Sequence, residues 1–314
     1  MFKDFFLAEL RYALRQPMIY IFLSLMALLV FGATASDNVM IGGSVGNVLK
    51  NAPHIITVFT SVMTIFGLLI AAAYFNNAAL KDHNNQFNEI LFSTQLSRSG
   101  YFFGRFFGAL VLSTIPMLGV YLGVFLGSVL GPAFGWVDAD RFGPYYLETF
   151  VNNYLLFILP NMFFAGSIVY ALAQKWKSTV ISFVGALVII IAYIISGTLM
   201  SDIDNETLGA LTDSFGIRAY SLYAKYYTPI EKNTLSPTLS GILLLNRLLW
   251  IAVGSVILGV SYWGFSFMEK NKKVKAPKAE KATAQGTLVK PKVQPVFSGK
   301  PVGRSSEVSF TPTY

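Results

Sequence analysis

The chain has 314 residues, of which 54% are hydrophobic and 13% are charged, with a net charge of +8 and no cysteine. A soluble domain carries about 25% charged residues, and so apolar a chain could not hide its apolar surface in a soluble fold. The same numbers exclude disorder over most of the chain, a disulfide scaffold and a thiolate metal site. The composition predicts a polytopic membrane protein.

The first predicted element is an amphipathic helix within residues 1–17. At helical periodicity its apolar residues share a broad face, and Arg11 and Arg15 lie opposite. Such a helix is expected to lie in the membrane interface with its basic edge toward lipid phosphates. Glu9 falls in the middle of the apolar face. It either snorkels to water or lies near a helix end, or it forms a buried ion pair with a cytoplasmic basic residue that ties this helix to a moving part.

Six apolar stretches follow, and each approaches the length of about 20 residues that a membrane-spanning helix needs. None of them contains a Lys, Arg, Asp or Glu residue. The stretches cover about 18–34, 55–75, 106–130, 154–172, 179–199 and 248–268. They predict an all-α membrane protein with a six-span transmembrane domain over residues 18–268.

The distribution of Lys and Arg predicts that both termini are cytoplasmic. In that orientation 18 of the 24 basic residues lie inside, in residues 1–17, 76–105, 173–178 and 269–314. Positive residues prefer the cytoplasmic side, and the inside still leads by eight to six when the tail is left out. The basic charge is therefore attributed to topology and to contact with anionic lipid, and no nucleic-acid partner is expected.

Glycines recur every four residues before and within the third span. This spacing places them on one stripe, where a neighbouring backbone can approach closely. The neighbour is either another helix of the same chain or a second copy. Pro116 and Pro160 are expected to kink the third and fourth spans. The glycines are Gly104, Gly108, Gly119, Gly123, Gly127 and Gly131.

The longest outer loop covers residues 200–242. Within it Tyr220, Tyr223 and Tyr227 share a helical face, which predicts a short helix resting on the membrane surface, with a solvated binding lid as the alternative. Residues 269–314 are rich in Lys, Pro, Ser, Thr and Gly and have little periodicity. They predict a basic, disordered cytoplasmic tail.

No motif for enzyme chemistry is present. The sequence has no GxxxxGK[ST] phosphate loop, no HExxH and no GxSxG, and its two histidines are predicted on opposite sides of the membrane. Proton-driven carriers usually place acids or histidines in their spans, so a proton-coupled carrier is not favoured, although sodium sites built from backbone carbonyls stay open. The pattern indicates a non-enzymatic membrane subunit that is driven by a separate motor.

The segment between the second and third spans reads KDHNNQFNEILFSTQLSRSGYFFGRFFGAL, from Lys81 to Leu110. It resembles the signature of ABC-2 type transporter permeases, RDRERGTLELLLATPVSR, which is followed by a helix with a Gly-Lys or Gly-Arg pair. The chain departs from it at Gln95, where proline is usual, and at residues 84–86, where charged residues and glycine are usual. The matching positions are Asp82, Glu89, Thr94, Ser97, Arg98, Gly104 and Arg105.

A narrower resemblance involves the segments DSFGIRAY, YYTPIEKN and LLLNRLLWI. They look like the N-terminal half of permeases that are fused to a zinc metallo-aminopeptidase. The two resemblances cover nearly all of residues 1–268. They imply a permease subunit of an ATP-driven exporter in the bacterial cytoplasmic (inner) membrane, paired with a second permease copy as homodimer or heterodimer. The alternative is a non-transporting scaffold or anchor for a peptidase or another partner.

The resemblance also implies that the loop 76–105 couples the spans to an ABC ATPase subunit. ATP and magnesium would then bind the ATPase, and this chain would hold no cofactor or metal. A short helix from Glu89 to Ser93 is expected to bury its apolar face against its own bundle or in a groove of that partner. Ser97 is expected to cap the helix that leads into the third span. The implied contact residues are Glu89, Thr94, Leu96, Ser97 and Arg98, with Arg98 facing acids of the ATPase and Glu89 pairing with Arg105 or across the interface.

Overall fold

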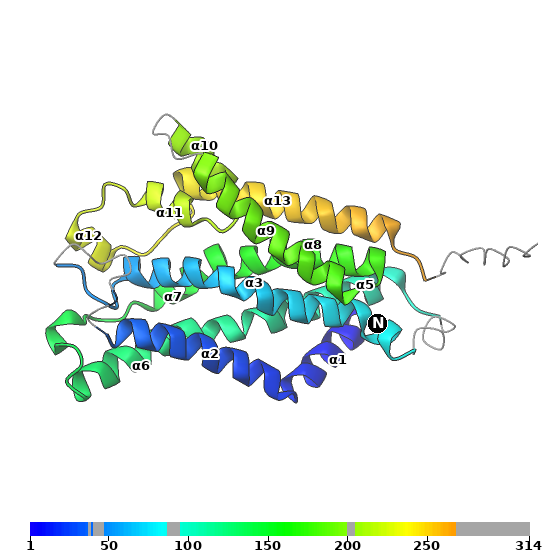
Figure 1. Ribbon diagram of the computed structural model, residues 1–314, viewed down its shortest axis with the longest axis horizontal. Coiled ribbons are helices and arrows are strands. Elements are labelled where there is room, and N and C mark those ends of the chain that lie inside the picture. Colours follow the sequence, from blue (N-terminus) through cyan, green and yellow to red (C-terminus); the bar gives the residue numbers. More distant parts are fainter. Residues whose placement is uncertain (37–38, 40–46, 87–94, 200–204, 268–314) are drawn as a thin grey trace, which may run out of the picture. The chain divides into compact units, whose positions relative to one another are not determined.

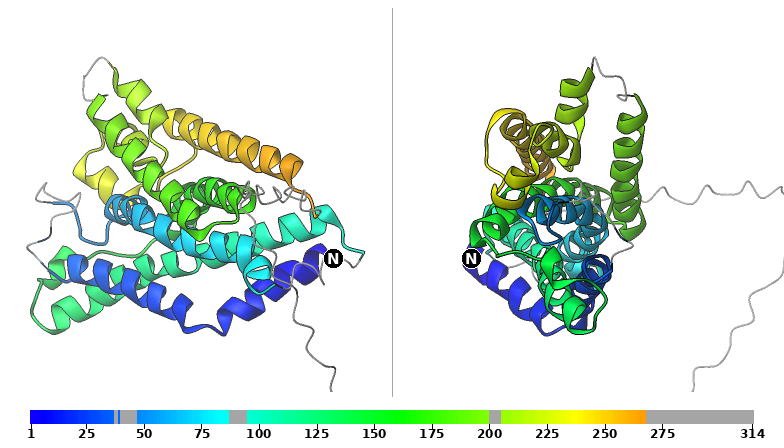
Figure 2. Two further views of the ribbon diagram at one scale, coloured as in Figure 1. Left: turned by 45° about the vertical axis from the view of Figure 1, so that its right-hand side comes forward. Right: turned by 90° about the vertical axis from the view of Figure 1, so that its left-hand side faces the viewer.

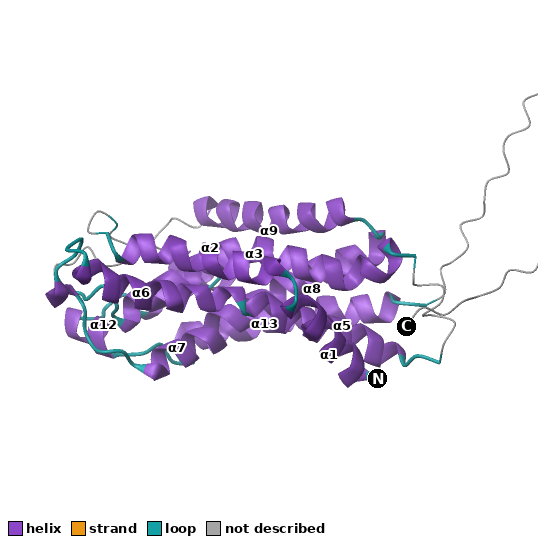
Figure 3. Cartoon of the chain, turned by 90° about the horizontal axis from the view of Figure 1, so that it is seen from below, coloured by secondary structure: helices purple, strands orange, loops and turns teal. Residues whose placement is uncertain are grey.

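The computed structural model describes residues 1–36, 39, 47–86, 95–199 and 205–267. The predicted tail over residues 269–314, the predicted helix from Glu89 to Ser93, and Thr94 lie outside the described residues. Within the described part the chain forms helices and loops and no strand (Figure 3).

Six helical segments of the described chain are long and apolar enough to cross a membrane. They are Pro17–Thr34, Pro53–Asn84, Arg98–Ala133, Leu147–Trp176, Thr179–Gly197 and Gly241–Gly264. The predicted all-α fold with six candidate spans is therefore confirmed, and it is compatible with a multi-pass membrane protein. Four of these segments extend at least five residues past the apolar stretch of the sequence at one or both ends, so that they include Asp82, Arg105 and Arg247.

The first two helices meet at a bend (Figure 1). Helix α1 covers Phe2–Leu14, and α2 covers Pro17–Thr34 with its proline in the first turn. Proline fits there because the first N–H groups of a helix have no partner within the helix. Helix α3, Pro53–Asn84, begins in the same way.

Breaks interrupt the third and fourth segments near the two expected prolines. The third consists of α5 (Arg98–Thr114), a 3₁₀ turn at Pro116–Leu118 and α6 (Gly119–Ala133). The fourth consists of α7 (Leu147–Asn153), a π-helical turn at Tyr154–Ile158 and α8 (Leu159–Trp176). Proline lacks the N–H that would continue the helical ladder, which accounts for both positions.

The remaining helices are α9 (Thr179–Leu199), the short α10 (Glu206–Thr212), α11 (Ile217–Tyr223) and α12 (Pro229–Thr234), and α13 (Gly241–Gly264). Tyr220 is 2% exposed and its hydroxyl lies 2.9 Å from His54 Nδ1. Tyr220 of α11 therefore faces the bundle, whereas Tyr223 is the last residue of that helix and Tyr227 lies beyond its end.

Helices α3 and α8 lie at the centre of the bundle, between α9 and α13 on one side and α1 and α2 on the other (Figure 2). The most apolar parts of α3 and of the segment Leu147–Trp176, which ends in α8, are 72% and 67% buried, whereas those of α2, α9 and α13 are below 30%. The outer helices thus expose broad apolar faces, as lipid contact requires. One end of the bundle holds α1 with the end of α3 and the start of α5, and is called the N-terminal end below. The opposite end, near α12, is called the α12 end (Figure 1).

Candidate functional site

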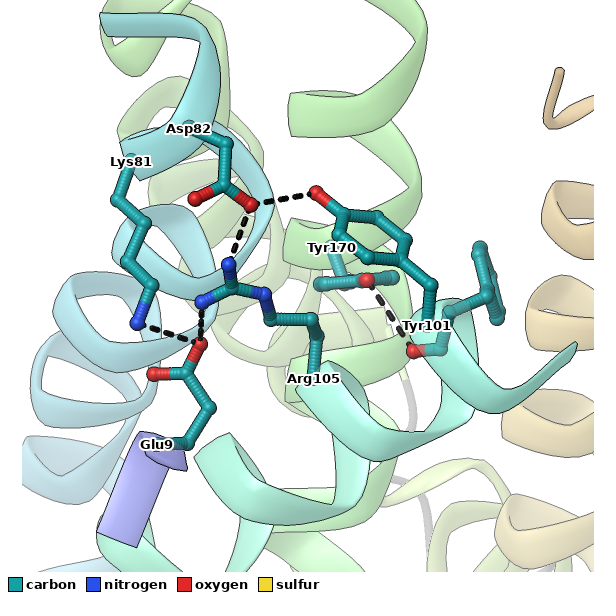
Figure 4. A network of polar contacts seen from close by, with 7 residues as sticks. Glu9, Lys81, Asp82, Tyr101, Arg105 and Tyr170 are labelled. Atoms are coloured by element: carbon teal, nitrogen blue, oxygen red, sulfur yellow. Dashed lines mark hydrogen bonds and ion pairs between the residues drawn. The ribbon is translucent and has the colours of Figure 1, made fainter. Parts of the chain in front are cut away.

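Four charged side chains from three helices meet inside the N-terminal end (Figure 4). Arg105 of α5 donates to Glu9 Oε1 of α1 and to Asp82 Oδ2 of α3. Lys81 Nζ lies 2.8 Å from Glu9 Oε1. The hydroxyl of Tyr101 donates to Asp82 Oδ2 over 2.8 Å. We call Glu9, Lys81, Asp82, Tyr101 and Arg105 the charge network.

The network resolves the two interpretations of Glu9. Its side chain is 2% exposed, so it does not snorkel to water. It forms a buried ion pair with Arg105 and a second contact with Lys81. The structure therefore contains the buried ion pair, and the tie of α1 to a moving part stays a prediction.

Two glycines of α5 let α1 come close enough for this contact. A Cβ on Gly104 would lie 2.8 Å from Phe5 Cβ, and a Cβ on Gly108 would lie 2.7 Å from Glu9 Cβ. Real Cβ atoms do not approach so closely, so larger residues would push α1 away. Glu9 therefore meets Arg105 because Gly104 and Gly108 flank that arginine on the face of α5 that contacts α1.

The charge network contains two acids and two bases, so its formal charges cancel. The two bases differ in how many acids they contact. Arg105 contacts both Glu9 and Asp82, whereas Lys81 contacts Glu9 and is itself 16% exposed. Burial raises the pKa of Glu9, and the facing Arg105 guanidinium opposes this rise. Buried charges are tolerated only when they are paired, so Arg105 is the group on which the network depends.

The network lies at both ends of the loop that joins α3 to α5. Helix α3 ends at Asn84, two residues after Asp82, and α5 begins at Arg98, seven residues before Arg105. Within the described residues no group of three His, Cys, Asp or Glu could hold a metal ion. The charge network can hold helices together, because it joins both ends of the loop to each other and to α1.

The residues next to the loop have partners within the chain. Ser97 caps α5 as expected, since its Oγ accepts from Gly100 N at 3.2 Å. Arg98 donates to the carbonyl oxygens of Tyr262 and Trp263 at the end of α13, and its guanidinium carbon lies 4.8 Å from the centre of the Tyr262 ring. Leu96 is half-buried. Pairing of Arg98 with acids of a partner stays a prediction, and Glu89 and Thr94 lie outside the described residues.

The glycines of α6 face α2 of the same chain. A Cβ on Gly123 would lie 2.5 Å from the carbonyl oxygen of Ala27, and one on Gly127 would lie 2.6 Å from Thr34 Cβ. Gly119 is closer still to the backbone of α2, whereas Gly131 has ordinary contact distances. The stripe is thus used within the chain. Arg11 and Arg15 of α1 are exposed.

No motif in the sequence predicts a role for Lys81, Tyr101 or the buried Arg247. Tyr101 and Arg105 are four residues apart and so share one helix face, and this spacing could have predicted that Tyr101 lies near the contacts of Arg105. The sixth apolar stretch begins at residue 248 and excludes Arg247, whereas α13 begins at Gly241 and includes it.

Comparisons of the chain with protein-family models, with curated proteins and with solved structures find no match.

Proposed function

We propose that the chain is the transmembrane subunit of an ATP-driven exporter of the ABC-2 type, which moves substrate across the membrane with energy from a separate ATPase chain. Six helical segments of membrane-spanning length supply the body of such a subunit. The observation that carries the proposal is the buried contact of Arg105 with Glu9 and Asp82 at the ends of the α3–α5 loop.

A force on this loop would act on two long helices at once. Asp82 and Arg105 hold the end of α3 to the start of α5, and Arg105 also holds α1 through Glu9. Packed helices joined by buried polar contacts move as a unit, so a displacement of the loop would pass into the bundle without being lost in the loop. Arg98 extends the unit to the end of α13.

The proposal includes the partners and the location. An ABC ATPase would contact Glu89, Thr94, Leu96, Ser97 and Arg98, and would bind the ATP and magnesium. A second permease copy would complete the exporter. Both termini would be cytoplasmic in a bacterial inner membrane. Helix α1 would lie in the interface with its exposed Arg11 and Arg15 toward lipid phosphates.

The test is purification of the tagged full chain from its native membrane in a gentle detergent, with stoichiometry by mass spectrometry. Recovery of a P-loop ATPase at about one copy per chain, as a symmetric assembly requires, is the expected result. Recovery of a peptidase, or of no ATPase in any detergent, would overturn the exporter proposal and favour a membrane anchor.

A further inference from the structure

In the π-helical turn that precedes α8, a side chain from α13 reaches a backbone carbonyl close to Pro160. Because proline has no N–H, the carbonyl of Leu156 four residues earlier lacks its usual helical donor, and the turn at Tyr154–Ile158 is π-helical. Arg247 of α13 reaches this place. Its Nη1 lies 3.4 Å from the carbonyl oxygen of Leu156 and 2.8 Å from Oδ1 of Asn161.

Arg247 is 1% exposed and is among the largest fully buried side chains of the described residues. Its Nε lies 2.9 Å from Asn246 Oδ1, to which Nη2 also donates. All of these direct acceptors are neutral, and the nearby charge is the fully buried carboxylate of Asp213, which acts on Arg247 electrostatically without an ion-pair contact among the described residues. A buried cation inside an apolar helix is costly, so its presence points to a role.

Two amide side chains extend this contact to other parts of the molecule. Asn161 donates to Thr64 Oγ1 of α3 at 2.8 Å and to the carbonyl of Phe215 at 2.9 Å. Asn246 donates to the carbonyl of Asp213 at 2.8 Å. One connected set of hydrogen bonds thus joins α3, α8, α13 and the segment between α10 and α11.

That segment is shaped around the guanidinium. Gly216 has φ of +79°, which glycine adopts without strain. A Cβ at this position would also lie 2.6 Å from Arg247 Cζ. Glycine is required here both by the backbone conformation and by the space that Arg247 occupies.

We propose that Arg247 is a positioning residue that locks the α12 end of the bundle, by fastening the π-helical turn before α8 (called the α8 break below) and the α10–α11 segment to α13. Neutral oxygens hold a guanidinium more weakly than carboxylates do, so this contact opens more readily than an ion pair. Its release frees the α8 break to bend and exposes the α10–α11 segment. The lock depends on contacts within the chain alone, so its test and the test for an ATPase partner succeed or fail separately.

The chain contains no cysteine, so single cysteines report local opening without background. Ser214→Cys, at a position that is 7% exposed, reports on the α10–α11 segment. Ser167→Cys, at a fully buried position farther along α8, is the matched control. The rate of reaction with a maleimide is measured on the full chain in detergent, with and without Arg247→Met.

Arg247→Met keeps a long side chain and removes every donor. We expect it to raise the labelling rate of Ser214→Cys about tenfold, since several hydrogen bonds that close the segment are lost, and to leave Ser167→Cys unchanged. An unchanged rate at Ser214→Cys would overturn the proposal. An equal rise at both positions would overturn it too, because Arg247 would then serve the folding of the whole bundle.

Pro160→Ala tests whether Arg247 acts through its contact with the carbonyl of Leu156 at the α8 break. It restores a backbone N–H that competes with Arg247 for the carbonyl of Leu156. We expect it to raise labelling of Ser214→Cys alone and to add nothing in the Arg247→Met background, because both changes act on one contact. Independent, multiplicative effects would overturn this route. If Arg247→Met does not fold, Asn161→Ala, which removes one acceptor of Arg247, takes its place with the same expected and overturning results.

Discussion

Arg105 of α5 and Glu9 of α1 form an ion pair although 96 residues separate them in the chain. The side chain of Glu9 is 2% exposed and that of Arg105 is 7% exposed. The same guanidinium also holds Asp82 of α3 (Figure 4). One base therefore serves two acids that come from different helices, and the three side chains are not equally important for stability.

Replacement of Arg105 should be the most damaging single change in the charge network. Arg105→Met leaves Glu9 and Asp82 buried without their shared base, and loss of one partner of a buried pair costs about 3–5 kcal/mol. We expect a large fall in the apparent melting temperature of the detergent-solubilised chain. Arg11→Met, at an exposed arginine of α1, is the matched control and should change stability by less than about 0.5 kcal/mol. Equal melting temperatures for the two variants would contradict the assignment.

The damage caused by Arg105→Met should be partly repaired by Glu9→Gln. The second change removes one of the two acids that the first leaves unpaired, while it keeps the size of the side chain. The two effects on the unfolding free energy should therefore not add, with an interaction of about 0.5–3 kcal/mol, as found for residues in one network. Thermal unfolding of the two single variants and the double variant measures this. Additive losses would show that Glu9 and Arg105 act independently.

The pH dependence of stability should show that burial raises the pKa of Glu9. Burial raises the pKa of Glu9 above its usual value of 4.5, so the folded chain binds this proton more tightly than the unfolded chain. The stability that the proton contributes is fully present below the unfolded pKa and is lost as the pH rises through the folded pKa. Relative to wild type, Glu9→Gln should therefore gain melting temperature as the pH rises from 4.5 and then level off. A relative loss over this range would mean that Arg105 and Lys81 outweigh burial.

The positions of the six helical segments could be predicted from the sequence, because each contains a long apolar run. The ends of four of them could not. A hydropathy pattern stops where charges begin, whereas the helix continues as long as its charged residues find partners. Asp82 and Arg105 extend α3 and α5 because each neutralises the other across the helix pair.

The members of the candidate site were only partly predictable. Glu9 stood out as an acid on an apolar helix face, but its partner depends on how α1 packs against α5 through Gly104 and Gly108. Such a pairing is a property of the assembled bundle. The contacts of Arg247 were harder to predict. Its acceptors are a backbone carbonyl and two side-chain amides, which leave no charge pattern in the sequence.

The glycine stripe of α6 should respond to a single methyl group. Gly123→Ala places a Cβ 2.5 Å from the carbonyl oxygen of Ala27, and overpacking of this kind costs about 1–3 kcal/mol. Gly131→Ala is the control, because its Cβ would lie 3.5 Å from Ala35 Cα, an ordinary contact. Melting temperature and self-association by chemical cross-linking are measured together. Unchanged melting with reduced self-association in Gly123→Ala would assign the stripe to a second copy.

The contact with the proposed ATPase should depend on Leu96 and not on its neighbour Gln95. Leu96 is half-buried at the end of the α3–α5 loop, whereas Gln95 is exposed. Leu96→Asp puts a charge into an apolar contact, which costs at least 1–3 kcal/mol when no partner is supplied, and so should reduce co-purification of the ATPase about tenfold or more. Gln95→Asp adds the same charge one residue away and should leave co-purification intact, with melting temperatures unchanged in both variants. Loss of the ATPase in both variants would point to general charge repulsion at the loop. Retention in both would remove Leu96 from the contact, and the contact would then have to depend on the other proposed residues of the α3–α5 loop.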